Sequence, residues 1–194
     1  CRCGRRRLGG RSRRPRGPVA FSCPIFVNLA IDISEPLETL LRGRSRSGLR
    51  AEWNRIQREG GRWHVTRDPA DFESFYREMY VPHVTARHGS RALITPPDNL
   101  VGKWIRSGGS LILITQDRHP IAGVTVRTAG STCILGEEGI LESMESAGYS
   151  SGLQVGLKCA GIEFARSMGL TRLVLGRSLA RLGDPVLVNK LRWG

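Results

Sequence analysis

The feature that most constrains the fold is a strand–helix–strand pattern in the last third of the chain. Ser131–Leu135 predicts a short strand, residues 150–168 have the apolar periodicity of a helix, and Leu173–Leu175 is a continuous apolar run. Ser150 or Ser151 is expected to cap this helix, and Gly169 after it is a standard stop signal. A strand that is apolar on both faces is typical of a parallel sheet covered by helices. The pattern therefore predicts two neighbouring parallel strands joined by a right-handed helical crossover.

The region before this unit predicts an antiparallel meander. Leu111–Thr115 and Ile121–Thr128 are apolar runs separated by a short turn, and Ser131–Leu135 follows as a third strand. Residues 137–149 are acidic and punctuated by glycine, so we expect a loop there. The fold class is therefore α/β (α+β), with a mixed, mostly antiparallel sheet and one strand–helix–strand crossover.

The first half of the chain predicts helices. Residues 37–59 carry apolar side chains at helical spacing and predict one helix. Asp68 and Pro69 are a cap and a first helical residue, so a second helix begins there. Pro82 is expected to end or kink that helix, because proline lacks the backbone N–H. A third helix is predicted over residues 98–107.

Composition indicates one domain without a membrane span. The 194 residues are 40% hydrophobic, which is enough to bury one core, and no apolar run reaches the roughly 18–20 residues of a membrane helix. The apolar stretch 19–33 is interrupted by polar residues and predicts a buried strand, so we expect residues 19–194 to form a single domain. The 5 cysteines are odd in number and scattered, which favours a reducing, cytoplasmic location over a disulfide framework.

Positive charge is concentrated at the start of the chain. Residues 1–18 hold eight of the 30 basic residues and no acidic one, whereas the remaining chain has 22 basic and 17 acidic residues. We expect a disordered, arginine-rich leader. The other interpretation is weak, salt-sensitive binding of polyanions by this leader.

Three segments together resemble a known superfamily. Residues 37–80 contain a basic helix, a strand and a helix with the pattern Asp-Pro-x-Asp-x-x-x-Phe-Tyr. His119–Val124 follows as a strand, and Leu173–Gly194 combines an apolar strand, a Gly/Arg/Ser turn and a late Lys-x-x-Trp-Gly. In this order the segments resemble the GNAT acyltransferase superfamily, specifically its FemAB-like and BioF2-like acetyltransferase branch.

The resemblance implies a GNAT-like sheet with helices on both faces and two central parallel strands that diverge to admit the acyl donor. It places the start of the helix after the first of these strands, with Tyr149, Ser151 and Gly152, near the donor. The glycine-rich loop typical of coenzyme A-dependent members is absent here, and Gly148, Gly152 and Gly156 stand at a spacing of four instead. The implied co-substrate is therefore acyl-CoA or aminoacyl-tRNA, without a metal.

Five further residues are candidates for the chemistry. By resemblance, the Lys190 ammonium would hold an acyl carbonyl or a phosphate. Arg177 and Ser178 follow the predicted last strand, at the end where open α/β sheets bind ligands. Glu137 and Glu138 follow the third predicted strand, where a carboxylate could deprotonate an attacking amine. Each also has a structural interpretation as a solvated or turn residue, and no cysteine or serine is paired with histidine in a nucleophile pattern.

The resulting functional prediction is an N-acyltransferase of the GNAT/FemAB-like type, moving an acyl or aminoacyl group from a thioester or ester to an amine. The alternatives are a basic nucleic-acid-binding module or a catalytically degenerate GNAT-like domain. The resemblance also implies that relatives continue beyond Gly194. The prediction requires that the two parallel strands diverge and leave room for the donor.

Overall fold

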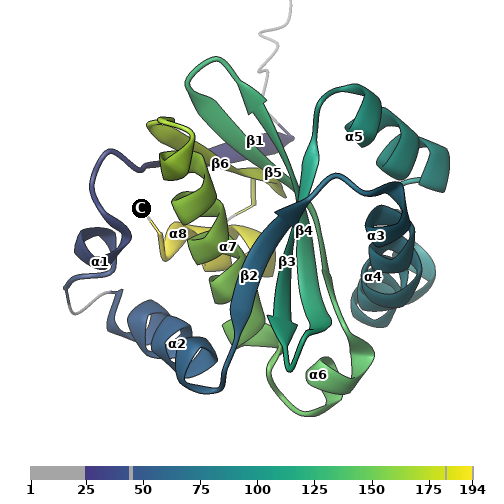
Figure 1. Ribbon diagram of the computed structural model, residues 1–194, viewed down its shortest axis with the longest axis horizontal. Helices are drawn as coiled ribbons and strands as arrows, with labels where there is room; N and C mark the ends of the chain where they lie inside the picture. The colour runs from purple at the N-terminus through teal and green to yellow at the C-terminus, as the bar shows by residue number, and fades with distance from the viewer. Residues whose placement is uncertain (1–24, 44–45, 182, 194) are drawn as a thin grey trace, which may run out of the picture.

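A six-stranded sheet forms the centre of the molecule (Figure 1). The computed structural model describes residues 25–43, 46–181 and 183–193. The strand order is β1-β6-β5-β4-β3-β2, with these bounds: β1 (Phe26–Asp32), β2 (Arg62–Thr66), β3 (Ser110–Gln116), β4 (His119–Ala129), β5 (Thr132–Ile140) and β6 (Arg172–Leu179). Among the described strands, β5 and β6 form the parallel pair and the other neighbours are antiparallel. The mixed sheet and its parallel pair are thus confirmed.

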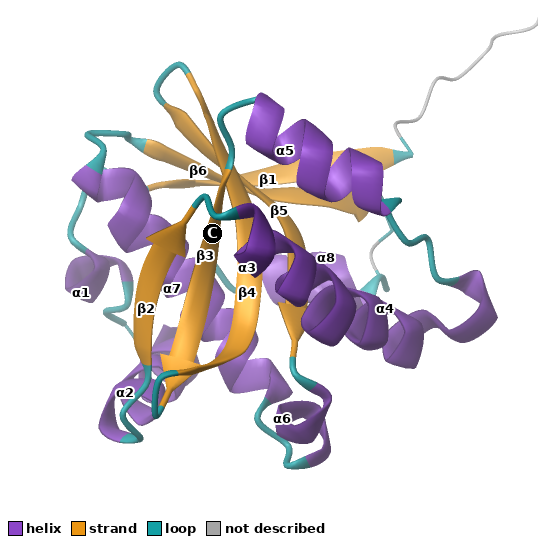
Figure 2. Cartoon of the chain, turned by 45° about the vertical axis from the view of Figure 1, so that its right-hand side comes forward, coloured by secondary structure: helices purple, strands orange, loops and turns teal. Residues whose placement is uncertain are grey.

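Helices cover both faces of the sheet (Figures 1 and 2). The first face carries α1 (Leu37–Leu40), α2 (Ser47–Arg58), α7 (Ser150–Ser167) and α8 (Pro185–Leu191). The second carries α3 (Pro69–Ser74), the π-helical η2 (Phe75–Tyr80), α4 (Val81–His88), the π-helical η4 (Asp98–Gly102) and α5 (Lys103–Arg106). Two short helices occupy connections: η3 (Gly89–Arg91) follows α4, and α6 (Glu142–Ser146) joins β5 to α7.

Each face has its own apolar core. The larger core lies between α7 and the sheet, where Leu157 and Ile162 are fully buried. The second core lies under α3 and η2 and contains Phe72 and Phe75, both fully buried. Gly139 lets η2 lie directly on β5, because an added Cβ would be 2.6 Å from the Tyr80 nitrogen. The sheet is therefore held between two separately packed layers.

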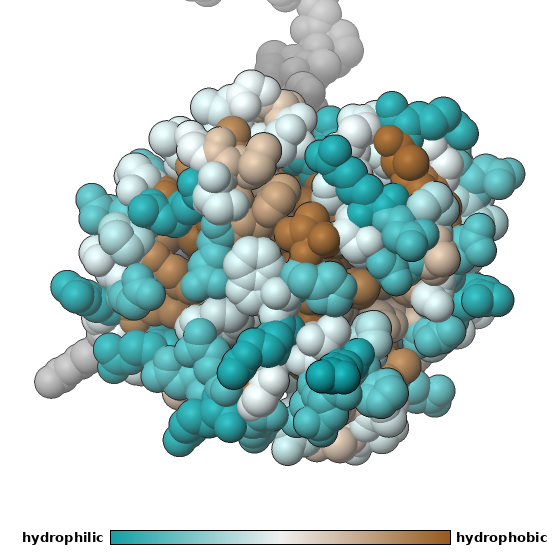
Figure 3. All heavy atoms as spheres, viewed as in Figure 1, coloured by the Kyte–Doolittle hydropathy of each residue, from teal (hydrophilic) through white to brown (hydrophobic). Residues whose placement is uncertain are grey.

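The surface in view is largely hydrophilic, with its apolar side chains in small separate areas (Figure 3). In the part of the chain that the structure describes, we find no helix with the length and apolarity needed to cross a bilayer. The predicted leader, residues 1–18, and its polyanion binding lie outside the described residues.

The prediction of one helix over residues 37–59 was wrong, because the chain forms α1 and α2 with a break between them. Gly43 adopts φ +99°, a conformation that a helix cannot include. Arg46 donates from Nη1 to the Leu40 carbonyl at 2.7 Å, which satisfies an acceptor left free where α1 ends.

The second predicted helix begins as expected but continues past Pro82. Asp68 accepts a hydrogen bond from the Ala70 nitrogen at 2.9 Å, which confirms its capping role. Pro82 lies in the first turn of α4, directly after the π-helical η2. The wider π turn changes the hydrogen-bond spacing just where proline has no N–H to donate, so the helical path is not interrupted.

The predicted loop over residues 137–149 was also wrong. Its first part continues β5 to Ile140, because β4 provides ladder partners as far as Ala122. Its second part forms α6. Glycine and acidic residues suggested a loop, but pairing with a distant strand outweighs local propensity.

Three smaller expectations also need correction. β6 extends to Leu179, so Arg177 and Ser178 lie within the strand rather than after it. The N-cap of α7 is Tyr149, which makes no side-chain cap within the described residues, and neither Ser150 nor Ser151 has that role. The described part of the apolar stretch 19–33 forms β1, a half-exposed edge strand rather than a buried one.

Candidate active site

β5 and β6 separate after a short parallel stretch. Their register covers three residue pairs, Thr132–Ile134 with Arg172–Val174, although both strands continue well beyond it. Past this point each strand keeps its outer neighbour: β5 stays paired with β4 to Ile140, and β6 stays paired with β1 to Leu179. We call the region between 135–140 of β5 and 175–179 of β6 the wedge.

A bulge in each strand marks the start of the wedge. Gly136 and Glu137 of β5 together oppose the single residue Thr125 of β4. Leu175 and Gly176 of β6 likewise oppose one residue of β1, and Gly176 has φ +72°. Bulges bend a strand and increase its twist, so two of them at the same level account for the divergence.

The bulges also decide which side chains face α7. Side chains alternate along a strand, and an extra residue shifts the alternation. The register therefore places Glu138 on the α7 face with Leu135, and Glu137 on the opposite face. In β6 it places Ser178 on the α7 face with Leu173, and the exposed Arg177 side chain on the other.

Buried polar side chains gather at the wedge. Seven polar or charged residues are buried among those that the structure describes, and five of them lie here: His83, Gln154, Lys158, Ser178 and Lys190. They come from α4, α7, β6 and α8. Burying polar groups costs free energy, so such a concentration marks a candidate functional site.

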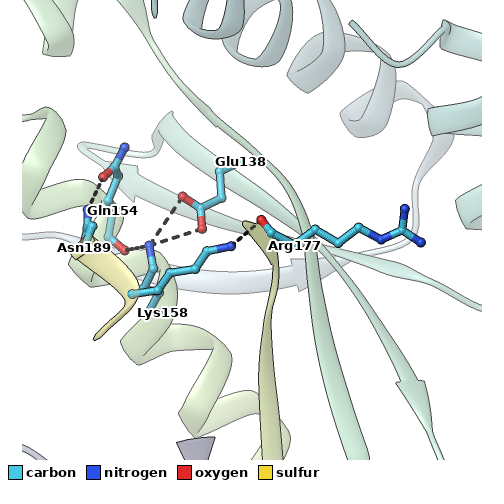
Figure 4. Close-up of polar contacts among 6 residues, drawn as sticks. Glu138, Gln154, Lys158, Arg177 and Asn189 are labelled. Carbon is cyan, nitrogen blue, oxygen red and sulfur yellow. Dashed lines mark hydrogen bonds and ion pairs between the residues drawn. The ribbon is translucent and has the colours of Figure 1, made fainter. Parts of the chain in front are cut away.

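Lys158 of α7 forms an ion pair across the wedge with Glu138 of β5 (Figure 4). Its Nζ is 3.2 Å from Glu138 Oε1 and donates to the Gln154 carbonyl at 3.2 Å. Lys158 is 3% exposed, so the pair lies mainly out of water. Such a pair is weak support for stability, because desolvation offsets most of the attraction.

Lys190 reaches the wedge from α8. Asp184 caps this helix by accepting from the Leu187 nitrogen at 2.8 Å, and Pro185 occupies its first turn. Lys190 Nζ donates to the Arg177 carbonyl at 2.9 Å, beside Gly176, whose added Cβ would be 3.8 Å from this nitrogen.

The pKa of Lys190 is lowered to about 8, mainly by burial and in smaller part by the nearby Lys158 ammonium, whereas Glu138 and Asp184 act in the opposite direction. A lysine with this pKa is partly neutral near physiological pH.

Gln154 connects the two helical layers. Asn189 of α8 contacts its side-chain amide at 3.0 Å (Figure 4). With the Gln154 amide oxygen turned toward α4, both terminal nitrogens of Arg87 donate to it, at 2.7 and 3.0 Å. Because Arg87 belongs to the opposite layer from α7, this contact joins the layers where β5 and β6 have separated.

His83 and Glu145 form a second pair near the wedge. His83 Nδ1 is 2.6 Å from Glu145 Oε1, and the imidazole is 3% exposed. Burial lowers the pKa of His83, while Glu145 and Glu138 raise it and Arg87 lowers it.

Glu137 and the start of α7 are occupied by other contacts. The Glu137 carboxylate accepts from Thr125 at 3.1 Å and from Thr95 at 3.3 Å. The Arg55 guanidinium lies 4.9 Å from the Tyr149 ring centroid. Gly152 packs closely under α2, since an added Cβ would be 2.5 Å from Arg55 Nη2.

The structure thus brings together four of the eight residues proposed from sequence: Lys190, the Arg177 backbone, Glu138 and, on the same face, Ser178. Glu137 lies on the other face, while Tyr149, Ser151 and Gly152 lie at the start of α7. Ser178 Oγ is buried and has no hydrogen-bond partner within the described residues.

Sequence reasoning missed Lys158, Gln154, His83 and Glu145. Lys158 gave a usable signal, because it interrupts the apolar run of α7 between Leu157 and Cys159. A charge within a buried helix face requires a partner or a function. The His83–Glu145 pair is separated by 62 residues and gave no local signal.

Comparison with solved structures shows which proteins have a similar fold. No family model and no curated protein sequence matches the chain. FemX has a TM-score of 0.65 at 12% identity, covering 88% of this chain and 58% of FemX. L-PGS from Bacillus licheniformis has a TM-score of 0.58 at 16% identity, covering 81% and 48%.

A GCN5-related glucosamine N-acetyltransferase region of a fungal multi-domain GH3 β-N-acetylglucosaminidase has a TM-score of 0.50 at 14% identity, covering 87% of this chain and 19% of that protein. The chain has a GNAT-like fold of the FemAB-like type. It spans about half the length of FemX and L-PGS.

Proposed function

We propose that this chain is a transferase domain that moves an acyl or aminoacyl group from a thioester or ester donor to an amine. One observation carries the proposal: the parallel pair of a GNAT-like sheet diverges at two bulges, and the buried Lys158 and Lys190 lie there with the partly buried Glu138. A core gains nothing from burying two lysines beside a carboxylate, whereas a site that binds a polarised carbonyl does.

Lys190 is the group we assign to the acyl carbonyl. Its ammonium is held by the neutral Arg177 carbonyl rather than by a carboxylate, so it can also donate to a ligand oxygen. Ser178 Oγ lies on the same face and can add a second donor. Charge that develops on the carbonyl oxygen would be stabilised by both groups in a site of low polarity.

The other proposed residues have supporting positions. Glu137 holds the β5 bulge, because its backbone nitrogen donates to Thr125 Oγ1 at 2.9 Å. Tyr149, Ser151 and Gly152 form the first turn of α7, where we place the distal part of the donor. The exposed Arg177 side chain is a further contact for an anionic part of the donor.

The donor is acyl-CoA or aminoacyl-tRNA. Both Arg55 and Glu52 lie beside the first turn of α7, since an added Cβ at Gly152 would be 2.5 Å from Arg55 Nη2 and 2.7 Å from Glu52 Oε2. The two side chains form an ion pair at 2.9 Å, so their charges offset each other and the choice of donor is left to the binding experiment.

The test is a thermal-shift screen with acetyl-CoA, longer acyl-CoAs and alanyl- and lysyl-tRNA, followed by transfer assays with primary amines. A true donor raises Tm by mass action. Lys190→Met is expected to lower kcat/KM about 10²–10³-fold while donor binding remains. Arg181→Met, an exposed cation, is the matched control.

Two outcomes would contradict the proposal. The first is the absence of a Tm increase and of transfer with every donor. The second is a Lys190→Met variant with unchanged kcat/KM, which would remove Lys190 from the site.

A further inference from the structure

Transfer to an amine requires a group that accepts a proton, and the residues assigned above do not supply one. An amine is mostly protonated near pH 7 and must lose a proton before it attacks a carbonyl. Glu137 faces away from the wedge and is bonded to two threonine hydroxyls. Glu138 is paired with Lys158, and Lys190 is assigned to the carbonyl oxygen.

His83 is oriented as a proton acceptor would be. Its Nδ1 is fixed by Glu145 at 2.6 Å, which leaves Nε2 to exchange a proton with a ligand. A carboxylate in this position holds the imidazole in one tautomer and stabilises the imidazolium once it forms. Glu145 belongs to α6 and His83 to α4, so two separate elements hold the pair together.

The surroundings place this pair beside the wedge. α4 packs on β5, and the charged groups that act on His83 are Glu145 of α6, Glu138 of β5 and Arg87 of α4 itself. Arg87 lies one helical turn beyond His83 and contacts Gln154 of α7. His83 thus approaches the wedge from the layer opposite to Lys190.

We propose that His83, oriented by Glu145, accepts the proton of the attacking amine in the transfer reaction, a role that rests on the function proposed above. The amine nitrogen forms a bond to the acyl carbon while Lys190 holds the carbonyl oxygen. The C–O bond of an ester, or the C–S bond of a thioester, then breaks, and its electron pair leaves with the oxygen or sulfur. The ammonium form of the amine first releases one proton to solvent water. As the new C–N bond forms, a second proton passes from the amine nitrogen to His83 Nε2 and from there to the leaving group, so water is the only other proton acceptor needed.

The experiment measures kcat/KM against pH for the wild type, His83→Asn and Glu145→Gln, using the donor identified by thermal shift and a primary amine. Asparagine can keep the contact to Glu145 but lacks Nε2. We expect His83→Asn to lower kcat/KM about 10²–10⁴-fold and to lose the acidic limb that His83 produces. Donor-induced Tm shifts should equal those of the wild type.

Glu145→Gln is the second variant and tests the same role without removing the imidazole. Since Glu145 raises the pKa of His83, its loss is expected to move the acidic limb of the profile to lower pH. An NMR titration of the His83 ring should show the same downward shift, and this measurement does not depend on activity. His88→Asn, an exposed histidine at the end of the same helix, is the matched control.

The outcomes separate the two proposals. If the wild type transfers the acyl group and His83→Asn keeps both its rate and its acidic limb, the role of His83 is overturned and the transferase function stands. If the wild type neither binds nor transfers with any donor, the transferase function fails and the role of His83 fails with it. An acidic limb that does not move in Glu145→Gln, while the NMR titration does, also overturns the assignment.

Discussion

The two ends of the β5–β6 pair differ in what they bury. At the paired end, Cys133 and Leu173 are fully buried in the core under α7. At the open end, the same two strands border Lys158, Lys190 and Glu138. Apolar burial stabilises the fold, whereas buried charge costs free energy that packing does not return. The comparison assigns the paired end to stability and supports the proposal that the other end binds the donor.

The largest expected effect comes from changing one residue at each end. Leu173→Ala should lower the free energy of unfolding by about 2–5 kcal/mol, because it leaves a cavity in the core. Lys190→Met should leave that free energy unchanged or raise it, because it removes a desolvated ammonium. Urea denaturation followed by circular dichroism measures both. Equal losses in the two variants would show that the open end is structural as well.

The second expected effect is a dependence of the free energy of unfolding on pH, caused by Lys190 at the open end. Lys190 has a pKa of about 8 when folded, below the ordinary lysine value of 10.5. Between these values the unfolded chain binds more protons, so the contribution of Lys190 to stability rises with pH from about 8 to 10.5. The full rise is at most about 3 kcal/mol.

The measurement is the difference in unfolding free energy between the wild type and Lys190→Met across this range. Burial raises the pKa of Cys133 to about 11, but this thiol is present in both proteins, so its contribution cancels. A difference that is flat with pH would mean that Lys190 remains hydrated in the folded protein.

The smallest expected effect comes from changing Asp184, the residue that caps the helix α8 on which Lys190 lies. Asp184→Ala removes the helix cap and should cost about 1 kcal/mol of stability. Asp184→Asn keeps a capping oxygen and should cost less, while the pKa of Lys190 falls because one favourable charge is lost. Thermal unfolding gives the stability of both variants, and an NMR titration gives the pKa. Equal costs for alanine and asparagine would show that the charge of Asp184, rather than its cap, stabilises α8.

Local sequence patterns predicted those parts of the fold that depend on residues close together in the sequence. The sequence predicted the helix α7, the glycine that follows it and the cap formed by Asp68. Each of these features depends on residues only a few positions apart in the chain. The pairing of β1 with β6 was not predicted, because it joins segments almost 150 residues apart and β1 has no distinctive local pattern.

The candidate site was predicted only in part, because the sequence offered both Glu137 and Glu138 as the carboxylate. The bulge at Gly136 decides which of them faces α7, and a glycine in a strand pattern does not by itself show that a bulge is present. Lys190 was proposed because the late lysine resembles a family pattern. Lys158 was not proposed, because its position depends on a contact between α7 and β5 that no local pattern reports.

The short parallel stretch has a mechanical consequence. β1 and β6 form a two-stranded ribbon, β2 to β5 form a four-stranded one, and three residue pairs join them directly. Each ribbon is hydrogen-bonded along its own length, so an incoming molecule meets edges that are already ordered and little conformational entropy is lost on binding. A change in the separation of the two strand edges would rotate one ribbon against the other about those three pairs, beneath α7, which packs on strands of both ribbons.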